Sequence, residues 1–314
     1  MSSIARNRRN STVVGWLACA LLSIALSAPA SAQPKISTIV GQAEIVAVAV
    51  DGASATIYYA SDRPGAIFKM TGLFAAPTLV AGIAGGSIND GVPAAQAAVF
   101  PGRNGLAVDA GGNLFFTEPS LHRIRRIDAT TGVVTTVAGT RRVNGNDSRG
   151  IVGASATFTD LAAPGALAFS PASGDLFVAD ETWDIVYRIS SNGRGPITDS
   201  NGLAFRAVGG DTANVSIYVD FEYYNPFGYA GDNGPAIDAK LNHPRGLAFD
   251  SAGNLYIADT GNHVVRRVAA TGTISTIAGT GAPGYAGDGS SSPATSAQLF
   301  LPTGVVVDGQ GELF

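Results

Sequence analysis

The chain has little of the chemistry that most enzymes of its size carry. Its 314 residues include one cysteine, Cys19, and three histidines. A single thiol forms no intramolecular disulfide, so a folded domain here has to rely on its packed core. The sequence also lacks an H-E-x-x-H helix, a paired-cysteine metal motif and a G-x-S-x-G nucleophile elbow. It therefore has no sequence signature of zinc hydrolysis or of a Ser-His-Asp triad.

The N-terminal 32 residues differ from the rest of the chain. Three arginines lie within residues 1–9, an apolar run covers Val13–Ala28, and Ala30-Ser31-Ala32 precedes Gln33. This order is typical of a signal peptide with a small-x-small cleavage site. We expect residues 1–32 to be removed and the protein to be exported to the periplasm, cell surface or medium. An uncleaved anchor is the open alternative, and the membrane would then be contacted only through this segment.

Charge also limits the partners. The net charge is −4, and removal of residues 1–32 takes away three arginines and no acid, which leaves −7. An acidic domain lacks the positive surface that a phosphate backbone attracts. We therefore expect no nucleic-acid partner, and we expect a monomer.

What the chain does have is an internal repeat. Gly105–Gly139 and Gly246–Gly279 are closely similar, a weaker copy covers Ala166–Ser190, and another begins at Gly304. Equivalent residues at positions 106, 167, 247 and 305 are 61, 80 and 58 residues apart. These periods are too long for a leucine-rich or β-helical coil and suit a propeller blade with a long connector.

Each copy contains four short apolar runs separated by turn residues, which predicts a four-stranded antiparallel meander. The runs are apolar on both faces, as expected when neighbouring sheets cover both sides. A degenerate first copy is expected at Val46–Asp51, Thr56–Asp62, Ile67–Met70 and Leu79–Gly82. In the copy with the clearest pattern the strands are expected at Leu247–Phe249, Leu255–Ala258, Val264–Val268 and Ile274–Ala278.

These repeats resemble those of the NHL β-propellers, whose outline is G-[LV]-A-[VF]-D, then G-N-L-[YF]-[IV]-A-D, then N-H-x-[VI]-R-[RK]-[VI]. Gly246–Val268 follows the outline almost throughout, and the resemblance extends over most of the chain from about residue 46. It departs from the outline at Glu118 and Ser170, where the other copies have aspartate. The resemblance implies an all-β propeller of four-stranded blades over residues 33–314, with six blades when complete. Because the last copy stops in its second strand at Phe314, we expect the propeller to be incomplete at its C-terminus.

The resemblance favours a scaffold that binds a protein, peptide or carbohydrate ligand. The alternative is a metal-dependent hydrolase or lyase, similar to the gluconolactonase-like and peptidyl-amidating-lyase-like six-bladed propellers. That alternative needs a metal at the channel mouth, whereas the scaffold needs no cofactor.

The ligand is expected on the face that carries the connectors between blades, since loops on a rigid scaffold commonly carry function. Glu118, Asp180 and Asp259 end second strands and should reach this face. Two interpretations stay open for them: they accept hydrogen bonds from turn backbone in every blade, or several of them hold a calcium ion. Related G-Y-A-G-D segments add Tyr229, Asp232, Tyr285 and Asp288.

Residues that the other copies do not share give the remaining candidates. His243 and Arg245 flank a connector proline, whereas His122 and His263 share one repeat position and are expected to be structural. The long spacing before residue 247 marks an insertion that contains Tyr223, Tyr224 and Phe227. These aromatic side chains either pack against the scaffold or form an exposed platform for a carbohydrate or peptide.

Overall fold

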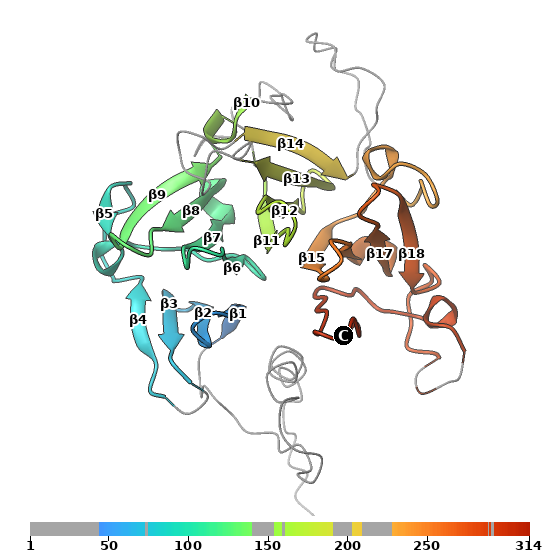
Figure 1. Cartoon of the computed structure of the whole chain (residues 1–314), viewed down its shortest axis with the longest axis horizontal. Helices are drawn as coiled ribbons and strands as arrows, with labels where there is room; N and C mark the ends of the chain where they lie inside the picture. The colour runs from blue at the N-terminus through green and yellow to red at the C-terminus, as the bar shows by residue number, and fades with distance from the viewer. Residues whose placement is uncertain are drawn as a thin grey trace, which may run out of the picture.

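The computed structural model describes residues 44–72, 75–139, 154–158, 161–190, 203–208, 228–287, 289 and 292–314. Four antiparallel sheets lie in an arc around a central axis, as Figure 1 shows. The strand nearest the axis begins each sheet, and the chain then moves outward through three further strands. This is the predicted propeller meander. In the described part of the chain no helix is long and apolar enough to cross a membrane.

The first two blades confirm the expected strand positions, including those of the degenerate copy. Blade 1 consists of β1 (Ile45–Asp51), β2 (Thr56–Asp62), β3 (Gly65–Met70) and β4 (Thr78–Ala81). Blade 2 consists of β6 (Leu106–Val108), β7 (Leu114–Glu118), β8 (Arg123–Ile127) and β9 (Val133–Ala138), with β5 (Val92–Pro93) at its outer edge.

The next two blades follow the same order. Blade 3 contains β11 (Pro164–Phe169), β12 (Leu176–Asp180), β13 (Ile185–Ser190) and β14 (Leu203–Val208), with β10 (Ala154–Ser155) outside β14. Blade 4 contains β15 (Pro244–Phe249), β16 (Leu255–Asp259), β17 (Val264–Val268) and β18 (Ile274–Ala278). The last residues then pair back on themselves, with Val307 opposite Leu313. Short 3-10 helices occupy Ala94–Gln96, Pro119–Leu121, Ala156–Phe158, Ala236–Asp238, Thr260–Asn262 and Ala294–Ser296.

Sequence patterns did not predict the fifth strand in blades 2 and 3. Each connector crosses the outer edge of the blade into which it leads, and there β5 pairs with β9 and β10 pairs with β14. Blade 4 has the same contact as a single bridge from Pro235 to Thr273. Outermost strands are the edges through which sheets aggregate, and in blades 2 to 4 the connector covers part of that edge.

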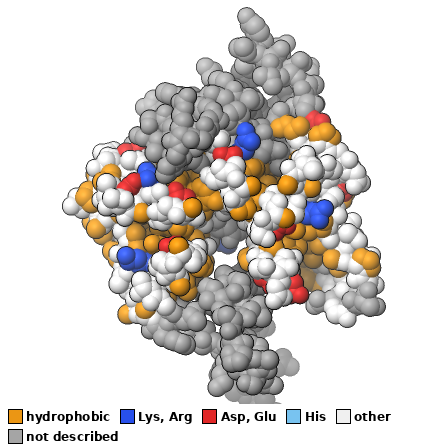
Figure 2. All heavy atoms as spheres, in the orientation of Figure 1, with side chains coloured by type: hydrophobic (Ala, Val, Ile, Leu, Met, Phe, Trp, Pro, Cys, Tyr) orange, Lys and Arg blue, Asp and Glu red, His pale blue; other side chains and the backbone are white. Residues whose placement is uncertain are grey.

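Most of the core lies between blades, and one smaller cluster lies on blade 1 alone. One cluster joins blades 1 and 2, a second joins blades 2 and 3, and a third joins blades 3 and 4. Edge-to-face ring pairs lie at two of these contacts, Phe115 with Phe169 at 5.0 Å and Phe177 with Phe249 at 4.9 Å. All five residues of β7, β8 and β16 are buried, as expected for strands that neighbouring blades cover on both faces. In Figure 2 the hydrophobic side chains gather between the blades.

The repeated basic residues of the third strands have a structural role, as their repetition indicates. In every blade the basic residue lies directly opposite an aromatic residue of the second strand. Cross-strand pairs of this kind stabilise a sheet. The pairs are Tyr58–Lys69, Phe115–Arg126, Phe177–Arg188 and Tyr256–Arg267.

Candidate functional site

The three acids that end second strands are buried and hold the connectors in place. Glu118, Asp180 and Asp259 are each 0% exposed. The backbone N–H of Phe100 donates to Glu118 Oε1 at 3.0 Å, that of Ala162 donates to Asp180 Oδ2 at 2.7 Å, and that of Asn242 donates to Asp259 Oδ1 at 2.7 Å. All three donors belong to the connector that leads into the acid's own blade, so the acids stabilise one repeated turn.

Burial changes the proton affinity of two of these carboxyls, those of Asp180 and Asp259. It raises the pKa of Asp180, although four backbone N–H groups donate to that side chain and act in the opposite direction. Burial likewise raises the pKa of Asp259 to about 6, against the lowering effects of Asn262, Asn242 and Arg266. Desolvation therefore outweighs the favourable contacts at both sites.

The raised value gives a pH prediction. Between about pH 4 and pH 6 the folded protein keeps a proton on Asp259 that the unfolded chain has released. The contribution of this group to the free energy of unfolding therefore falls as pH rises through that window and is constant above it. In a carbon-detected NMR titration we expect the Asp259 carboxyl signal to move with a midpoint near pH 6. The control is Asp250, whose pKa is lowered, and a common midpoint for both would contradict the assignment.

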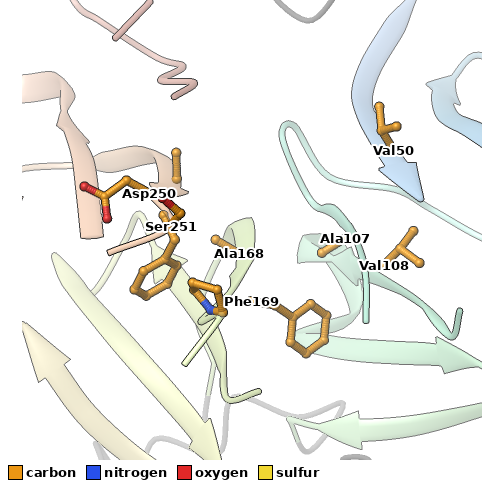
Figure 3. Close-up of a pocket in the computed structure, with 10 residues that line it drawn as sticks. Val50, Ala107, Val108, Ala168, Phe169, Asp250 and Ser251 are labelled. Atoms are coloured by element: carbon orange, nitrogen blue, oxygen red, sulfur yellow. The ribbon is translucent and has the colours of Figure 1, made fainter. Parts of the chain in front are cut away.

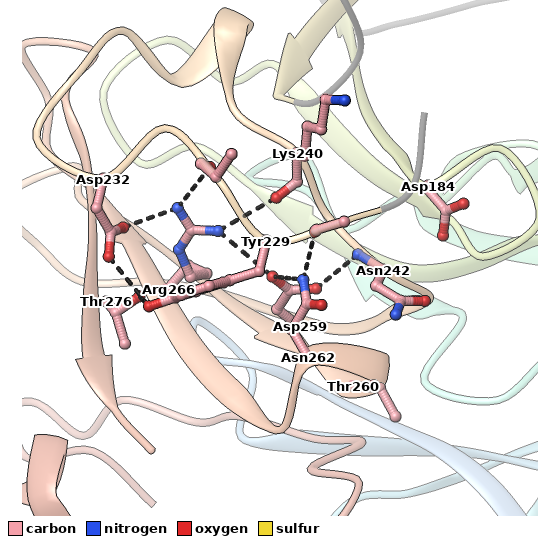
Figure 4. A network of polar contacts seen from close by, with 12 residues as sticks. Asp184, Tyr229, Asp232, Lys240, Asn242, Asp259, Thr260, Asn262, Arg266 and Thr276 are labelled. Carbon is pink, nitrogen blue, oxygen red and sulfur yellow. Dashed lines mark hydrogen bonds and ion pairs between the residues drawn. The ribbon is translucent and has the colours of Figure 1, made fainter. Parts of the chain in front are cut away.

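Buried arginines complete the attachment of the connectors, as Figure 4 shows for blade 4. Arg266 is 0% exposed and its guanidinium contacts Asp259 at 3.4 Å and Asp232 at 2.8 Å. It also donates to the carbonyl oxygens of Ala230 at 3.2 Å and Lys240 at 3.3 Å. In blade 2 the equivalent Arg125 donates to the carbonyls of Asn89 and Ala98 and pairs with Asp90 and Glu118.

The G-Y-A-G-D tyrosine is part of this attachment. The Arg266 guanidinium carbon lies 5.1 Å from the centre of the Tyr229 ring, and the Tyr229 hydroxyl contacts Thr276 and Asp232. Tyr229 therefore covers the buried cation, although it is 51% exposed. In the second copy Tyr285 is 80% exposed and lies against Phe300, which stacks on the His263 ring.

The turns between second and third strands connect each blade to the following connector. His122, Asp184 and His263 occupy the same turn position, with φ values of 53°, 55° and 56°. His122 Nδ1 donates to the carbonyl of Ala162, the His243 backbone N–H donates to Asp184 at 2.6 Å, and the Leu301 N–H donates to His263 Nδ1. The shared position confirms that His122 and His263 are structural, and Asp184 takes the same part in blade 3.

Residues outside the repeat pattern come together where blades 3 and 4 meet. Arg245 forms an ion pair with Glu181, and His243 Nδ1 lies 2.6 Å from Asn242 Oδ1 and 3.7 Å from Asp184 Oδ1. The side chains of His243, Arg245 and Glu181 are 52%, 39% and 34% exposed, whereas Asp184 is 5% exposed. We call Glu181, Asp184, Asn242, His243 and Arg245 the junction cluster.

Asn104 joins the junction cluster to the rest of the ring. Its side-chain amide donates to the carbonyls of Arg245 at 3.1 Å and Thr303 at 2.7 Å. Its backbone N–H donates to the carbonyl of Val46, and its own carbonyl accepts from Leu167. One exposed residue thus links the inner strands of four blades and the C-terminal segment, close to the axis on the connector face.

A cavity of about 470 Å³ lies at the opposite end of the inner strands (Figure 3). Its walls include Val50, Val108, Phe169 and Phe249, each of which is the last apolar residue before the first hairpin of its blade. These are repeated positions, and both phenylalanines pack on neighbouring blades. Sequence analysis missed this cavity because it depends on how the small residues Ala107, Ala168 and Ala248 line the axis.

Several predicted site residues are not brought together. Tyr223, Tyr224, Phe227 and Asp288 lie outside the described residues, and their predicted role stays a prediction. Glu118, Asp180 and Asp259 each serve a different blade. Within the described ranges, no three or more His, Cys, Asp or Glu side chains are grouped so that they could hold a metal ion.

The comparisons with known proteins agree with this architecture. The model of the teneurin NHL domain matches residues 225–285, which cover blade 4 and the later part of the connector before it. The chain is an NHL-repeat β-propeller. It is similar to human NHL repeat-containing protein 2, with 30% identity over 149 residues that make up 46% of this chain and 19% of that protein. It is also 26% identical over 260 residues, 69% of this chain, to the chloroplastic protein SUPPRESSOR OF QUENCHING 1 of Arabidopsis thaliana.

This NHL-repeat chain spans at most 24% of the length of those curated relatives. Among solved structures, an auxiliary nutrient binding protein from Bacteroides thetaiotaomicron has a TM-score of 0.56 at 16% identity, over 87% of this chain and 56% of that one. The gluconolactonase XC5397 from Xanthomonas campestris has a TM-score of 0.51 at 18% identity, over 86% and 69%. At these identities the NHL propeller shares the fold with both proteins.

Proposed function

We propose that this NHL propeller is an exported scaffold that binds a ligand on its connector face, at the junction cluster. The proposal rests on the positions at which blade 4 differs in sequence from the other repeats. Blade 4 has His243 and Arg245 on either side of its connector proline, whereas blade 3 has Ala163 and Gly165 there. Residues repeated in every blade serve the blade, so exposed polar residues that are not repeated are the better candidates for ligand contact.

The surroundings of the junction cluster support this choice. Buried acids and arginines hold the connectors, so the exposed side chains sit on a rigid support and lose little freedom when they bind. The predicted aromatic insertion belongs to the connector between β14 and β15, which also carries His243. The far cavity has a weaker claim because its walls are residues of the repeat itself.

Arrays of short peptides and oligosaccharides probed with the full-length mature protein test the proposal. We expect at least one group of probes to bind, and His243→Ala to abolish the signal without changing the melting temperature. Ser251→Ala, in the wall of the far cavity, is the matched control and should keep the signal. The opposite pattern, with loss in Ser251→Ala alone, would move the site to the far cavity.

Export rests on the N-terminal sequence, in which a basic start, an apolar run and a small-x-small site follow one another. We expect the secreted protein to begin at Gln33. N-terminal sequencing of protein recovered outside the cytoplasm checks this, and a mature chain that still begins at Met1 would favour the uncleaved anchor.

A further inference from the structure

We propose that the junction cluster recognises a carboxylate group of its ligand, and that Arg245 is the residue that binds it. The inference rests on the proposed function, because it names the ligand chemistry of the same site. Two kinds of ligand carry a carboxylate: an acidic sugar, and a peptide with a free C-terminus. Both belong to the ligand classes that a connector face of this kind could bind.

The hydrogen-bonding capacity of Arg245 is the first argument. A guanidinium has five N–H donors in a planar fork that matches the two oxygens of a carboxylate. In this structure Nη2 donates to Glu181 and Nε is buried, whereas the two N–H groups of Nη1 make no hydrogen bond within the described part of the chain. The side chain is nevertheless 39% exposed. Arg245 is therefore held in position by one partner and keeps donors for another.

The second argument is the sign of the accessible charge. The Asp184 carboxyl is 5% exposed and accepts the backbone N–H of His243, so it faces the protein. Glu181 is then the one accessible carboxylate of the cluster, and it is shared with Arg245. Arg103, next to the linking residue Asn104, adds an exposed cation at the same end of the inner strands. The exposed part of this site is thus positive on a chain of net charge −4, which favours an anionic ligand.

His243 gives a second contact beside the guanidinium. Its Nδ1 is engaged with Asn242, and its Nε2 makes no hydrogen bond within the described part of the chain, although the side chain is 52% exposed. Arg245 can therefore bind a carboxylate with its guanidinium, while His243 Nε2 can form a hydrogen bond with a neighbouring hydroxyl or amide of the same ligand. Uronic acids and peptide C-termini both carry such a group next to the carboxylate.

Calorimetric titration of the full-length mature protein tests the inference with two matched pairs of probes. The first pair is trigalacturonate and neutral galactotriose, and the second is a tripeptide with a free C-terminus and the same tripeptide amide. We expect one acidic probe to bind at least tenfold more tightly than its neutral partner, and which pair does so identifies the source. Arg245→Gln should reduce that affinity at least tenfold, since it removes a charged bidentate contact.

A second variant guards against misfolding of the first. Glu181→Gln removes the carboxylate that competes for Arg245, so acidic probes should bind several-fold more tightly to it than to the wild type. Equal binding of acidic and neutral probes, or failure of both acidic probes at millimolar concentration, would overturn the carboxylate inference. If binding on the arrays still depended on His243, that result would overturn the carboxylate inference and leave the proposed function standing. If His243→Ala did not change binding on the arrays, the proposed function itself would be wrong.

Discussion

Arg266→Met should lose about 3 to 5 kcal/mol of stability, the usual cost of removing one partner of a buried ion pair. The guanidinium is 0% exposed and contacts two carboxylates, two carbonyl oxygens and the Tyr229 ring. Methionine fills much of the volume but leaves the Asp259 carboxylate buried without its cation. Urea unfolding at pH 7 measures the change.

Two further variants separate this effect from a general loss of charge on β17. Arg267→Met, at the next position and only half-buried, should cost less than about 1 kcal/mol, the usual contribution of a cross-strand pair such as Arg267 with Tyr256. The double variant Arg266→Met with Asp259→Asn should be more stable than Arg266→Met alone, because the buried carboxylate is then absent and only the partly exposed Asp232 loses its cation. A double variant that is no better than the single one would show that Arg266 acts through packing rather than charge.

Gly279→Ala should cost on the order of 3 kcal/mol, because a methyl group at this position would collide with backbone. Gly279 has φ of 93°, and a Cβ atom there would lie 2.4 Å from the His263 carbonyl oxygen and 2.9 Å from the Val264 Cα atom. At Gly139 an added Cβ atom would lie 2.1 Å from the His122 carbonyl oxygen. In blades 2 and 4 the glycine after the fourth strand is therefore where the chain passes against the turn of its own blade.

The matched control is Gly272→Ala. Its φ is 90°, but nothing lies within 4 Å of the added Cβ atom, so only the backbone strain of about 1 to 2 kcal/mol remains. The difference between the two variants in thermal unfolding measures the close approach. Equal losses would mean that the turn moves aside at Gly279 and that the contact is not a fixed feature of the blade.

The strands could be predicted from sequence because each is a short apolar run closed by turn residues. Val264–Val268 and Ile274–Ala278 were predicted to the residue. The paths of the connectors were not predictable in this way, because their contacts join residues far apart in the chain. Val92, for example, pairs with Val134, and neither residue has a pattern that indicates the other.

The candidate site was predicted in part. His243 and Arg245 were found because they lie outside the repeat, and the same signal was available for Glu181 and Asp184, which replace residues of other types in the neighbouring blades. The partners of Arg266 were missed because its neighbour Arg267 has the repeated cross-strand position. Only the fold shows that the first arginine of the pair is buried against a connector.

The connector that crosses the outer edge of a blade also orders its assembly during synthesis. β5 leaves the ribosome before β6, β7, β8 and β9, yet its partner is β9, the last strand of that blade to be made. The edge segment, here β5, is therefore synthesised before the rest of its blade. It can pair only after the fourth strand has emerged from the ribosome. In blades 2 and 3 the exposed edge is in this way closed within the same sheet, before the next blade has been translated.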